Sequence, residues 1–290
     1  MIKNKKISRF IITVMLLIFV IAWIFPIWNV VATSSKTIDQ YLKQKPWVLS
    51  LESNVFKQFF LNARDGLTGK VKGGTGVAVF PALINSLIYG ILGAIIAIIC
   101  AALAAYSLSR LRVRSRFFLF MLIFSGTIFP FQIYLIPLFK MYQVLHIYDT
   151  RLGLILFYSA ICIPFSMLVL RNWFNGIPQE IIEAAQIDGC GSMHIFLKMI
   201  VPLSWAPFAT LFLLQFTWIW NDLLFGLTLS VSRNIRPIMT VLADLQNLRA
   251  PIPFPVVMAS TLVGSLPTII LVIAFQRYFF KGLTISIAGE

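Results

Sequence analysis

The stretch LIYGILGAIIAIICAALAA occupies residues 87–105 and contains no charged side chain. A helix that crosses the hydrocarbon core of a bilayer needs about 20 mostly apolar residues. The whole chain of 290 residues shares this character, because 59% of its residues are hydrophobic and only 12% are charged. A soluble domain carries about 25% charged residues. The stretch therefore predicts one of several membrane-spanning helices.

Six segments of the chain are long and apolar enough to span a membrane. They are residues 10–32, 81–108, 117–139, 152–172, 205–229 and 256–280. The first follows a basic N-terminus, as in a secretory signal peptide, but its apolar run exceeds the roughly 7–15 residues of a cleavable signal. We therefore predict an all-α integral membrane protein in which residues 1–290 form a single transmembrane domain.

The basic residues of short loops set the orientation of such a protein. Arg110, Arg112, Arg114 and Arg116 crowd the turn between the second and third spans. We expect this turn and both termini to face the cytoplasm, and residues 36–79 and 230–255 to face outward. The net charge of +14 is then explained by anchoring at the membrane surface, and no nucleic-acid partner is expected.

The first external segment becomes glycine-rich between Gly66 and Gly76, which makes the backbone permissive and predicts a mobile loop. It lacks the spacing of a phosphate-binding loop. In the second external segment, Pro251, Pro253 and Pro255 favour an extended run. The cysteines (Cys100, Cys162 and Cys190) and the two histidines are too scattered to predict a metal site or a disulfide framework.

Residues 176–204 predict a helix–turn–helix on the cytoplasmic side, between the fourth and fifth spans. Pro178 suits the first turn of a helix, Asp188-Gly189 is a turn signal, and Pro202 ends a second helix that starts near Ser192. Such a compact knob can be gripped by a soluble partner. The alternative is an interfacial helix that merely caps the bundle.

The same segment resembles the EAA loop of the permease subunits of bacterial ATP-binding-cassette importers. The residues that carry the resemblance are Glu183, Ala184, Ala185, Asp188, Gly189 and Pro202. Four further elements resemble the carbohydrate branch, the maltose-type permeases: Asn85-Ser86, residues 105–110, Trp220-Asn221-Asp222 and residues 276–284. The resemblance covers most of the chain except 36–79, and the tail at 285–290 departs from the family pattern.

The resemblance implies a type I importer permease fold in the bacterial inner membrane. In that family a second related permease completes the pore, and two ATPase subunits use ATP and Mg²⁺ beneath it. An extracytoplasmic binding protein delivers the sugar, and residues 231–255 correspond to a loop that contacts it. The six EAA-loop residues would couple this chain to the ATPases, while the chain itself would bind no cofactor and catalyse nothing.

Polar residues inside membrane spans are costly and are usually functional. The candidates for a substrate pathway are Gln132, Tyr134, Gln215, Trp218, Asn221 and Asp222. Amide and carboxylate groups can bond sugar hydroxyls, and aromatic faces can cover sugar C–H surfaces. The same residue types also anchor helices at the membrane interface or bond one helix to another.

Three other functions remain to be weighed against a sugar permease. The same architecture could carry another solute, such as an acidic oligosaccharide or an amino acid. A membrane enzyme is disfavoured because the chain has neither H-E-x-x-H nor G-x-S-x-G and no paired carboxylates within a span. A structural scaffold subunit would not need so ordered a cytoplasmic knob.

Overall fold

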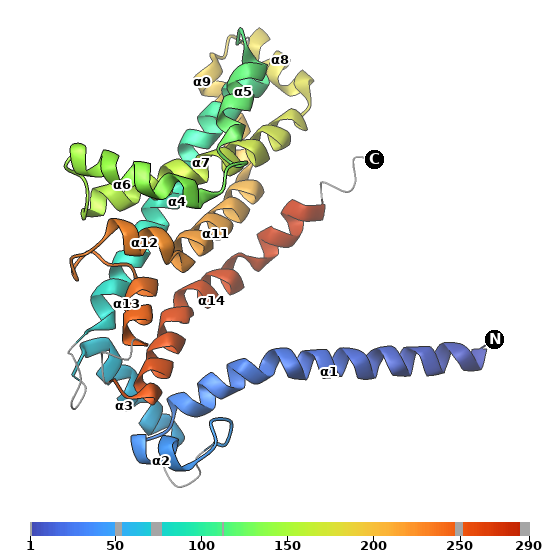
Figure 1. The fold of residues 1–290 in the computed structure, drawn as a ribbon. Coiled ribbons are helices and arrows are strands. Elements are labelled where there is room, and N and C mark those ends of the chain that lie inside the picture. The colour runs from blue at the N-terminus through green and yellow to red at the C-terminus, as the bar shows by residue number, and fades with distance from the viewer. Residues whose placement is uncertain (1, 50–53, 71–76, 112, 247–251, 285–290) are drawn as a thin grey trace. The chain divides into compact units, whose positions relative to one another are not determined.

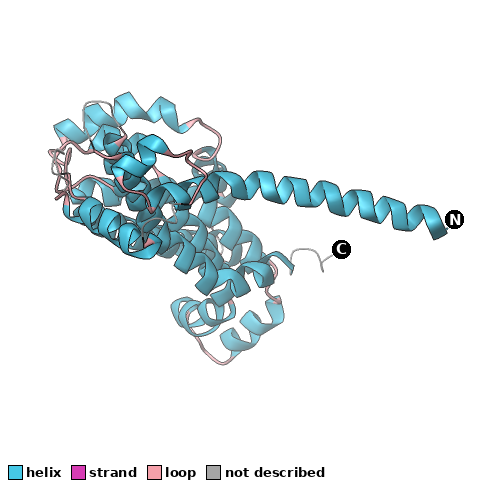
Figure 2. Cartoon of the chain, turned by 90° about the horizontal axis from the view of Figure 1, so that it is seen from below, coloured by secondary structure: helices cyan, strands magenta, loops and turns pink. Residues whose placement is uncertain are grey.

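The computed structural model describes residues 2–49, 54–70, 77–111, 113–246 and 252–284. Every regular element within these ranges is a helix, as Figure 1 and Figure 2 show. The chain divides into two compact units. The first contains residues 1–80 and 241–266, and the second contains residues 81–240 and 267–290.

The helices follow one another along the chain with short connections between most of them. In chain order they are α1 (Ile2–Ser34), α2 (Ile38–Lys43), α3 (Val55–Thr68), α4 (Val79–Arg110), α5 (Arg116–Ser125), η1 (Phe131–Tyr134), α6 (Leu135–Val144), α7 (Arg151–Asn175), α8 (Gln179–Ile187), α9 (Ser192–Ile195), η2 (Phe196–Ile200), α10 (Val201–Leu203), α11 (Trp205–Asn221), α12 (Leu224–Leu229), α13 (Ile238–Leu245) and α14 (Phe254–Thr284).

Four helices in the described ranges are each long and apolar enough to cross a membrane, namely Arg9–Ser34, Val79–Arg110, Arg151–Asn175 and Phe254–Arg277. They overlap the first, second, fourth and sixth predicted spans. The fifth predicted span is divided, because α11 ends at Asn221 and α12 begins at Leu224. Helix α11 follows Ser192–Leu203 with a bend of 74°, and only this bent pair taken together meets the same criterion.

The segment 117–139 is not the single helix that its apolarity predicts. It contains α5, a turn and η1, and α6 then runs to Val144. Gly126 ends α5, and Pro130 adopts an extended conformation. Proline lacks an N–H donor and disfavours helical geometry in the residue before it, so a break here is favoured over a continuous helix.

Residues 36–79 are helical in part, and the helices include the start of the glycine-rich stretch expected to be mobile. They contain α2 and α3, and the sequence expected a mobile loop from Gly66 onward. Gly66 lies inside α3, and Gly69 ends that helix in the left-handed conformation, which glycine adopts without strain. The correction has a local cause, because Asn54 caps α3 by accepting a hydrogen bond from the Lys57 N–H. Residues 71–76 lie outside the described ranges.

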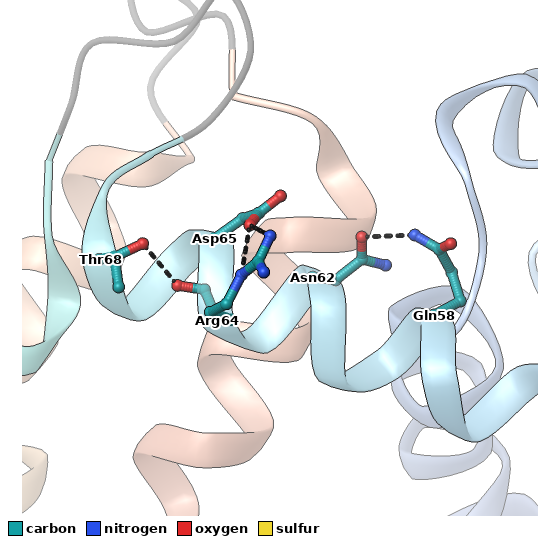
Figure 3. A network of polar contacts seen from close by, with 5 residues as sticks. All are labelled: Gln58, Asn62, Arg64, Asp65 and Thr68. Atoms are coloured by element: carbon teal, nitrogen blue, oxygen red, sulfur yellow. Dashed lines mark hydrogen bonds and ion pairs between the residues drawn. The ribbon is translucent and has the colours of Figure 1, made fainter.

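A polar network in the first unit fixes α3 to the end of α1. The buried Asn62 donates to the backbone carbonyls of Ser34 (2.8 Å) and Lys36 (2.9 Å). It also accepts from the side chain of Gln58, and Figure 3 shows this contact. The fully buried Lys36 donates through Nζ to the carbonyls of Lys45 and Pro46. These bonds pair backbone groups that would otherwise be costly to bury.

In the second unit, α4 packs through a face of small residues. Ala94, Ala97, Ala101 and Ala105 are buried, and a Cβ added at Gly90 would lie 2.8 Å from the Phe216 ring. Small residues allow helices in a membrane to approach closely, where van der Waals contact rather than the hydrophobic effect holds them together. Helix α4 therefore packs closely on α7 and α11.

The packing of α3 on α14 can be tested at Gly66. A Cβ at this position would lie 1.9 Å from the Ser260 hydroxyl, so Gly66→Val should overpack the contact and destabilise the protein by about 1–3 kcal/mol. Thermal unfolding of the purified protein measures the change. Thr68→Val, at an exposed position on the same helix, is the matched control and should be nearly neutral. Equal melting temperatures for both variants would contradict the close contact.

Candidate functional site

The second unit contains a cavity of about 990 Å³. Its walls come from η1, α11, the break after α11, the start of α12 and the second half of α14. The lining residues are Phe131, Gln132, Leu213, Leu214, Thr217, Trp218, Asn221, Asp222, Leu223, Leu224, Phe225, Val272 and Gln276. The volume is at the upper end of the roughly 300–1,000 Å³ of small-molecule sites.

Four of the six pathway residues selected from the sequence line this cavity: Gln132, Trp218, Asn221 and Asp222. The other two do not. Tyr134 is half-buried on η1 outside the lining. Gln215 is buried, and its amide donates to the Ser166 hydroxyl at 2.9 Å and, more weakly, to the Cys162 carbonyl at 3.4 Å. The structure thus gives Gln215 a bond between helices, which was the alternative interpretation for polar residues of this kind.

Asp222 is held in place at the break between α11 and α12. Its carboxylate accepts from the Tyr158 hydroxyl (2.8 Å), from the Gly226 N–H (3.0 Å) and, at 3.4 Å, from the Phe225 N–H. The first N–H groups of a helix have no partner within the helix, and within a membrane they must find one from the protein. Asp222 therefore stabilises the start of α12 while it forms part of the cavity wall.

Aromatic rings surround the same place. The Trp218 ring packs edge-on against Phe131 at 5.6 Å between centroids, and Phe157 lies 4.1 Å from Phe225. Such contacts between aromatic rings add stabilising free energy beyond that from burying their apolar surface, and so they fix the positions of the rings. The cavity thus combines rigid aromatic faces with amide groups and one carboxylate.

Residues 176–204 form the helix–turn–helix that the sequence predicts. Helix α8 begins after Pro178, and Gly189 has φ of +81°. The Gly189 N–H donates to the Gln186 carbonyl and the Cys190 N–H to the Ala185 carbonyl, which is the Schellman arrangement of a helix end. The second helix runs from Ser192 to Leu203 through the π-helical turn η2, so it ends one residue beyond Pro202.

The helix–turn–helix packs one face against the helix bundle and leaves its other face exposed. Ile182, Ala185, Ile195, Phe196 and Ile200 are buried in a core cluster with residues of α4 and α7. Most of the residues selected from the sequence are exposed instead: Glu183, Ala184, Asp188, Gly189 and Pro202. Their neighbours Ile187 (86% exposed) and Met193 (59% exposed) add apolar area to the outer face. Ala185 alone among the six faces the bundle.

The last turn of α4 is bonded to both helices of the knob. The Arg110 guanidinium donates to the backbone carbonyls of Phe174 and Ile177 and, at 2.7 Å, to the side chain of Gln179 at the start of α8. The Tyr106 hydroxyl donates to the Ser192 carbonyl (3.0 Å) at the start of α9. The positive charge of Arg110 also suits the negative end of the α7 dipole. The knob is therefore attached to α4 at two points.

A third group of contacts fixes the segment between α12 and α13. Asn85 donates to the carbonyls of Asn234 and Arg236, and Tyr89 donates to the carbonyl of Ile235 at 2.7 Å. Asp149, in the connection between α6 and α7, accepts from the N–H groups of Val231 and Ser232.

The environment of Asp149 also determines its pKa. Burial by itself would raise the pKa of this carboxyl. The hydrogen bonds from Ser232 and Val231, together with the charge of Arg236, outweigh burial and leave the pKa below its usual 3.8. Asp149 therefore stays ionised and keeps the segment after α12 attached at neutral pH.

Comparison with known proteins identifies the class. Residues 93–285 match the model of the family described as the binding-protein-dependent transport system inner membrane component. The match covers more than half of the chain. This protein belongs to that family of multi-pass inner-membrane permeases.

Individual relatives agree with this assignment. A probable ABC transporter permease protein of Pyrococcus horikoshii is 40% identical over 56% of this chain, and the match spans 59% of that relative's length. The trehalose transport system permease protein of Mycobacterium tuberculosis is 32% identical over 70% of this chain and 74% of its own length. A chain of a bacterial ABC transporter that imports the acidic polysaccharide alginate has the same fold, with a TM-score of 0.80. Its identity is 23%, and the match covers 95% of this chain and 98% of that one.

The sequence did not identify every residue that the structure brings to the site. Gln276 and Thr217 line the cavity, but one lies near the end of a long helix and the other has no unusual neighbours in sequence. Arg110 was interpreted only as a charge that sets orientation. A signal for its second role was present, since it ends the family-like segment 105–110, but its partners lie more than 60 residues away.

The role of Arg110 can be tested with Arg110→Lys. A lysine keeps the charge but lacks the planar fork that reaches several acceptors, so the start of α8 should lose at least one charge-assisted bond. Such bonds are worth about 1.5–3 kcal/mol, so protection of the α8 amides should fall at least about tenfold. Hydrogen exchange of the purified protein measures it. Arg114→Lys, at an exposed position, is the control, and equal α8 protection in both variants would refute the attachment.

Proposed function

We propose that this chain is a pore-forming permease subunit of an ATP-driven saccharide importer. The observation that carries the proposal is the exposed helix–turn–helix, because it combines the family's EAA pattern with rigid attachment to α4. Family membership supports the transport role. The relative named for trehalose transport supports a saccharide as the solute.

The knob is the proposed docking element of this chain for one of two ATPase subunits, which hydrolyse ATP with Mg²⁺. Glu183, Asp188 and the apolar Ile187 lie on its outer face, so charged and apolar contacts are both available to a soluble partner. Interfaces typically combine an apolar centre with polar surroundings. Gly189 sets the angle between the two helices, and Ala185 and Pro202 fix how the knob sits on the bundle and where it ends.

The cavity is the proposed part of the solute pathway that this chain contributes, and a second related permease completes it. Gln132, Asn221 and Gln276 offer amide groups to hydroxyls, and Trp218 offers an aromatic face. An extracytoplasmic binding protein delivers the solute. The segment after α12 suits that contact because Asn85 and Asp149 already order it, which lowers the entropic cost of binding.

A second candidate is an importer of acidic oligosaccharides. The specific observation in its favour is the fold shared with the alginate importer. At 23% identity that likeness extends to the fold alone. The two candidates differ in the charge of the solute that the cavity must accept.

Coupling is tested by Gly189→Val. A Cβ at Gly189 would meet nothing within 4 Å, so the strain comes from φ alone, and a left-handed conformation costs an ordinary residue about 1–2 kcal/mol. The variant should reach the membrane but lose the ATPase stimulation that a loaded binding protein produces in the reconstituted complex. Glu183→Gln should weaken docking by about 1.5–3 kcal/mol if its charge contacts the ATPase.

Gly191→Val is the matched control for that experiment. Gly191 is two residues away and equally open, but its φ is −72°, which valine adopts without strain. Stimulation should survive in this variant. Full stimulation in both the Gly189 and the Glu183 variants would show that the knob does not couple this chain to an ATPase.

Orientation is tested by cysteine labelling in a variant whose three native cysteines are replaced. Lys57→Cys on α3 should react with an impermeant maleimide added from outside, and Arg114→Cys should not react until the membrane is opened. Both positions are exposed, so access depends on the side of the membrane rather than on burial. The reverse pattern would invert the topology.

A further inference from the structure

The charged side chains that line the cavity bear on whether a neutral or an acidic saccharide can bind there. Among the lining residues that the structure describes, Asp222 is the only one with an ionisable side chain. The other polar groups are the amides of Gln132, Asn221 and Gln276 and the hydroxyl of Thr217. The described wall therefore offers no cation to a solute.

The carboxylate of Asp222 is held in one orientation at the cavity wall. Three donors hold its carboxylate: the Tyr158 hydroxyl and the N–H groups of Phe225 and Gly226. Tyr158 is itself fully buried, and its ring lies among those of Tyr89, Phe157 and Trp218. The hydrogen bonds that this carboxylate accepts favour its ionised form. The position of this charge is set by the fold before any solute enters.

Two effects would make the binding of an anionic solute beside this carboxylate unfavourable. The solute would lose water without a cation among the described lining residues to pair with, and it would be repelled by a like charge. A neutral saccharide meets neither penalty. Its hydroxyls both donate and accept, as amides do, and its C–H faces can lie on Trp218.

We infer that this cavity selects neutral saccharides and rejects those that carry a carboxylate, a sulfonate or a phosphate. The inference rests on the proposed function, since it assumes that the cavity is part of the solute pathway. It goes beyond that function because it decides between the two classes of saccharide that similarity alone leaves open. Asp222 is then a specificity-determining residue that acts by exclusion.

The experiment uses the complete importer complex in nucleotide-free form, without the binding protein, so that only the permease pathway is measured. The probes are neutral disaccharides (maltose, trehalose, sucrose and cellobiose) and, for each, the uronate in which one CH₂OH is oxidised to a carboxylate. Equilibrium binding by calorimetry at low salt should favour the neutral member of a pair at least about tenfold, since like-charge contact is costly. Trp218→Ala should weaken binding of the neutral member.

Adding a cation to the wall should reverse the preference. Gln276→Lys places an ammonium group in the lining, so the uronate should gain affinity relative to its neutral partner. Asp222→Asn keeps the size of the side chain and removes the repulsion, so it should reduce the difference in affinity between the neutral disaccharide and its uronate. Gln143→Lys adds the same charge at an exposed position on α6 outside the lining and should leave the ratio unchanged.

The outcomes distinguish failure of the inference from failure of the proposed function. Equal or tighter binding of the uronates in the unaltered complex, lost in Trp218→Ala, would overturn the neutral selectivity and leave the saccharide pathway standing. If the ratio of neutral-sugar to uronate affinity were the same in Gln276→Lys as in Gln143→Lys, the assignment of selectivity to this wall would be overturned. No binding of any probe, or binding that Trp218→Ala leaves untouched, would overturn the proposed pathway itself.

Discussion

The second unit depends on one constraint, which is that backbone N–H and C=O groups buried away from water must find partners within the protein. At three interruptions of its helices, a side chain supplies the missing bond. Asp222 accepts from the first N–H groups of α12, and Arg110 donates to the carbonyls at the end of α7. Asn85 and Tyr89 donate to the carbonyls of the segment after α12. These interruptions are therefore as fixed as the helices, and the cavity and the knob both lie at them.

This constraint explains why one helix carries so many of the contacts. Helix α4 has bonding side chains at both ends and small residues between them, so it can approach its neighbours closely and still satisfy their irregular segments. Residues that the sequence presents as separate patterns, Asn85-Ser86 and Tyr106 to Arg110, are the two ends of a single element. The Ser86 hydroxyl accepts from the Ile238 N–H, and the Tyr106 hydroxyl donates to the Ser192 carbonyl.

The parts of the fold that sequence could predict are those set by local chemistry. The uncharged run at 87–105 lies within α4, as predicted. Asp188-Gly189 forms a helix end in which Gly189 adopts the left-handed backbone conformation. The prediction of one helix over 117–139 was wrong, because it relied on the apolar character of the segment. Gly126 and Pro130 divide the segment although most of the residues around them are apolar enough for a membrane span. Prediction from the sequence also failed at Gly66, which was expected to begin a mobile loop but lies inside α3. The partners of Arg110 could not be predicted at all, because they depend on which helix ends meet in space.

Helix α4 also has a mechanical consequence. From Asn85 to Arg110 it is a continuous run of helix about 37 Å long, at ~1.5 Å per residue. A lever of that length converts a tilt of about 5° at the Asn85 end into a displacement of about 3 Å at the Arg110 end. The bonds at its two ends attach the segment after α12 and the knob to the same continuous helix. A small tilt of this helix about one end would thus displace the other end without any helix having to bend.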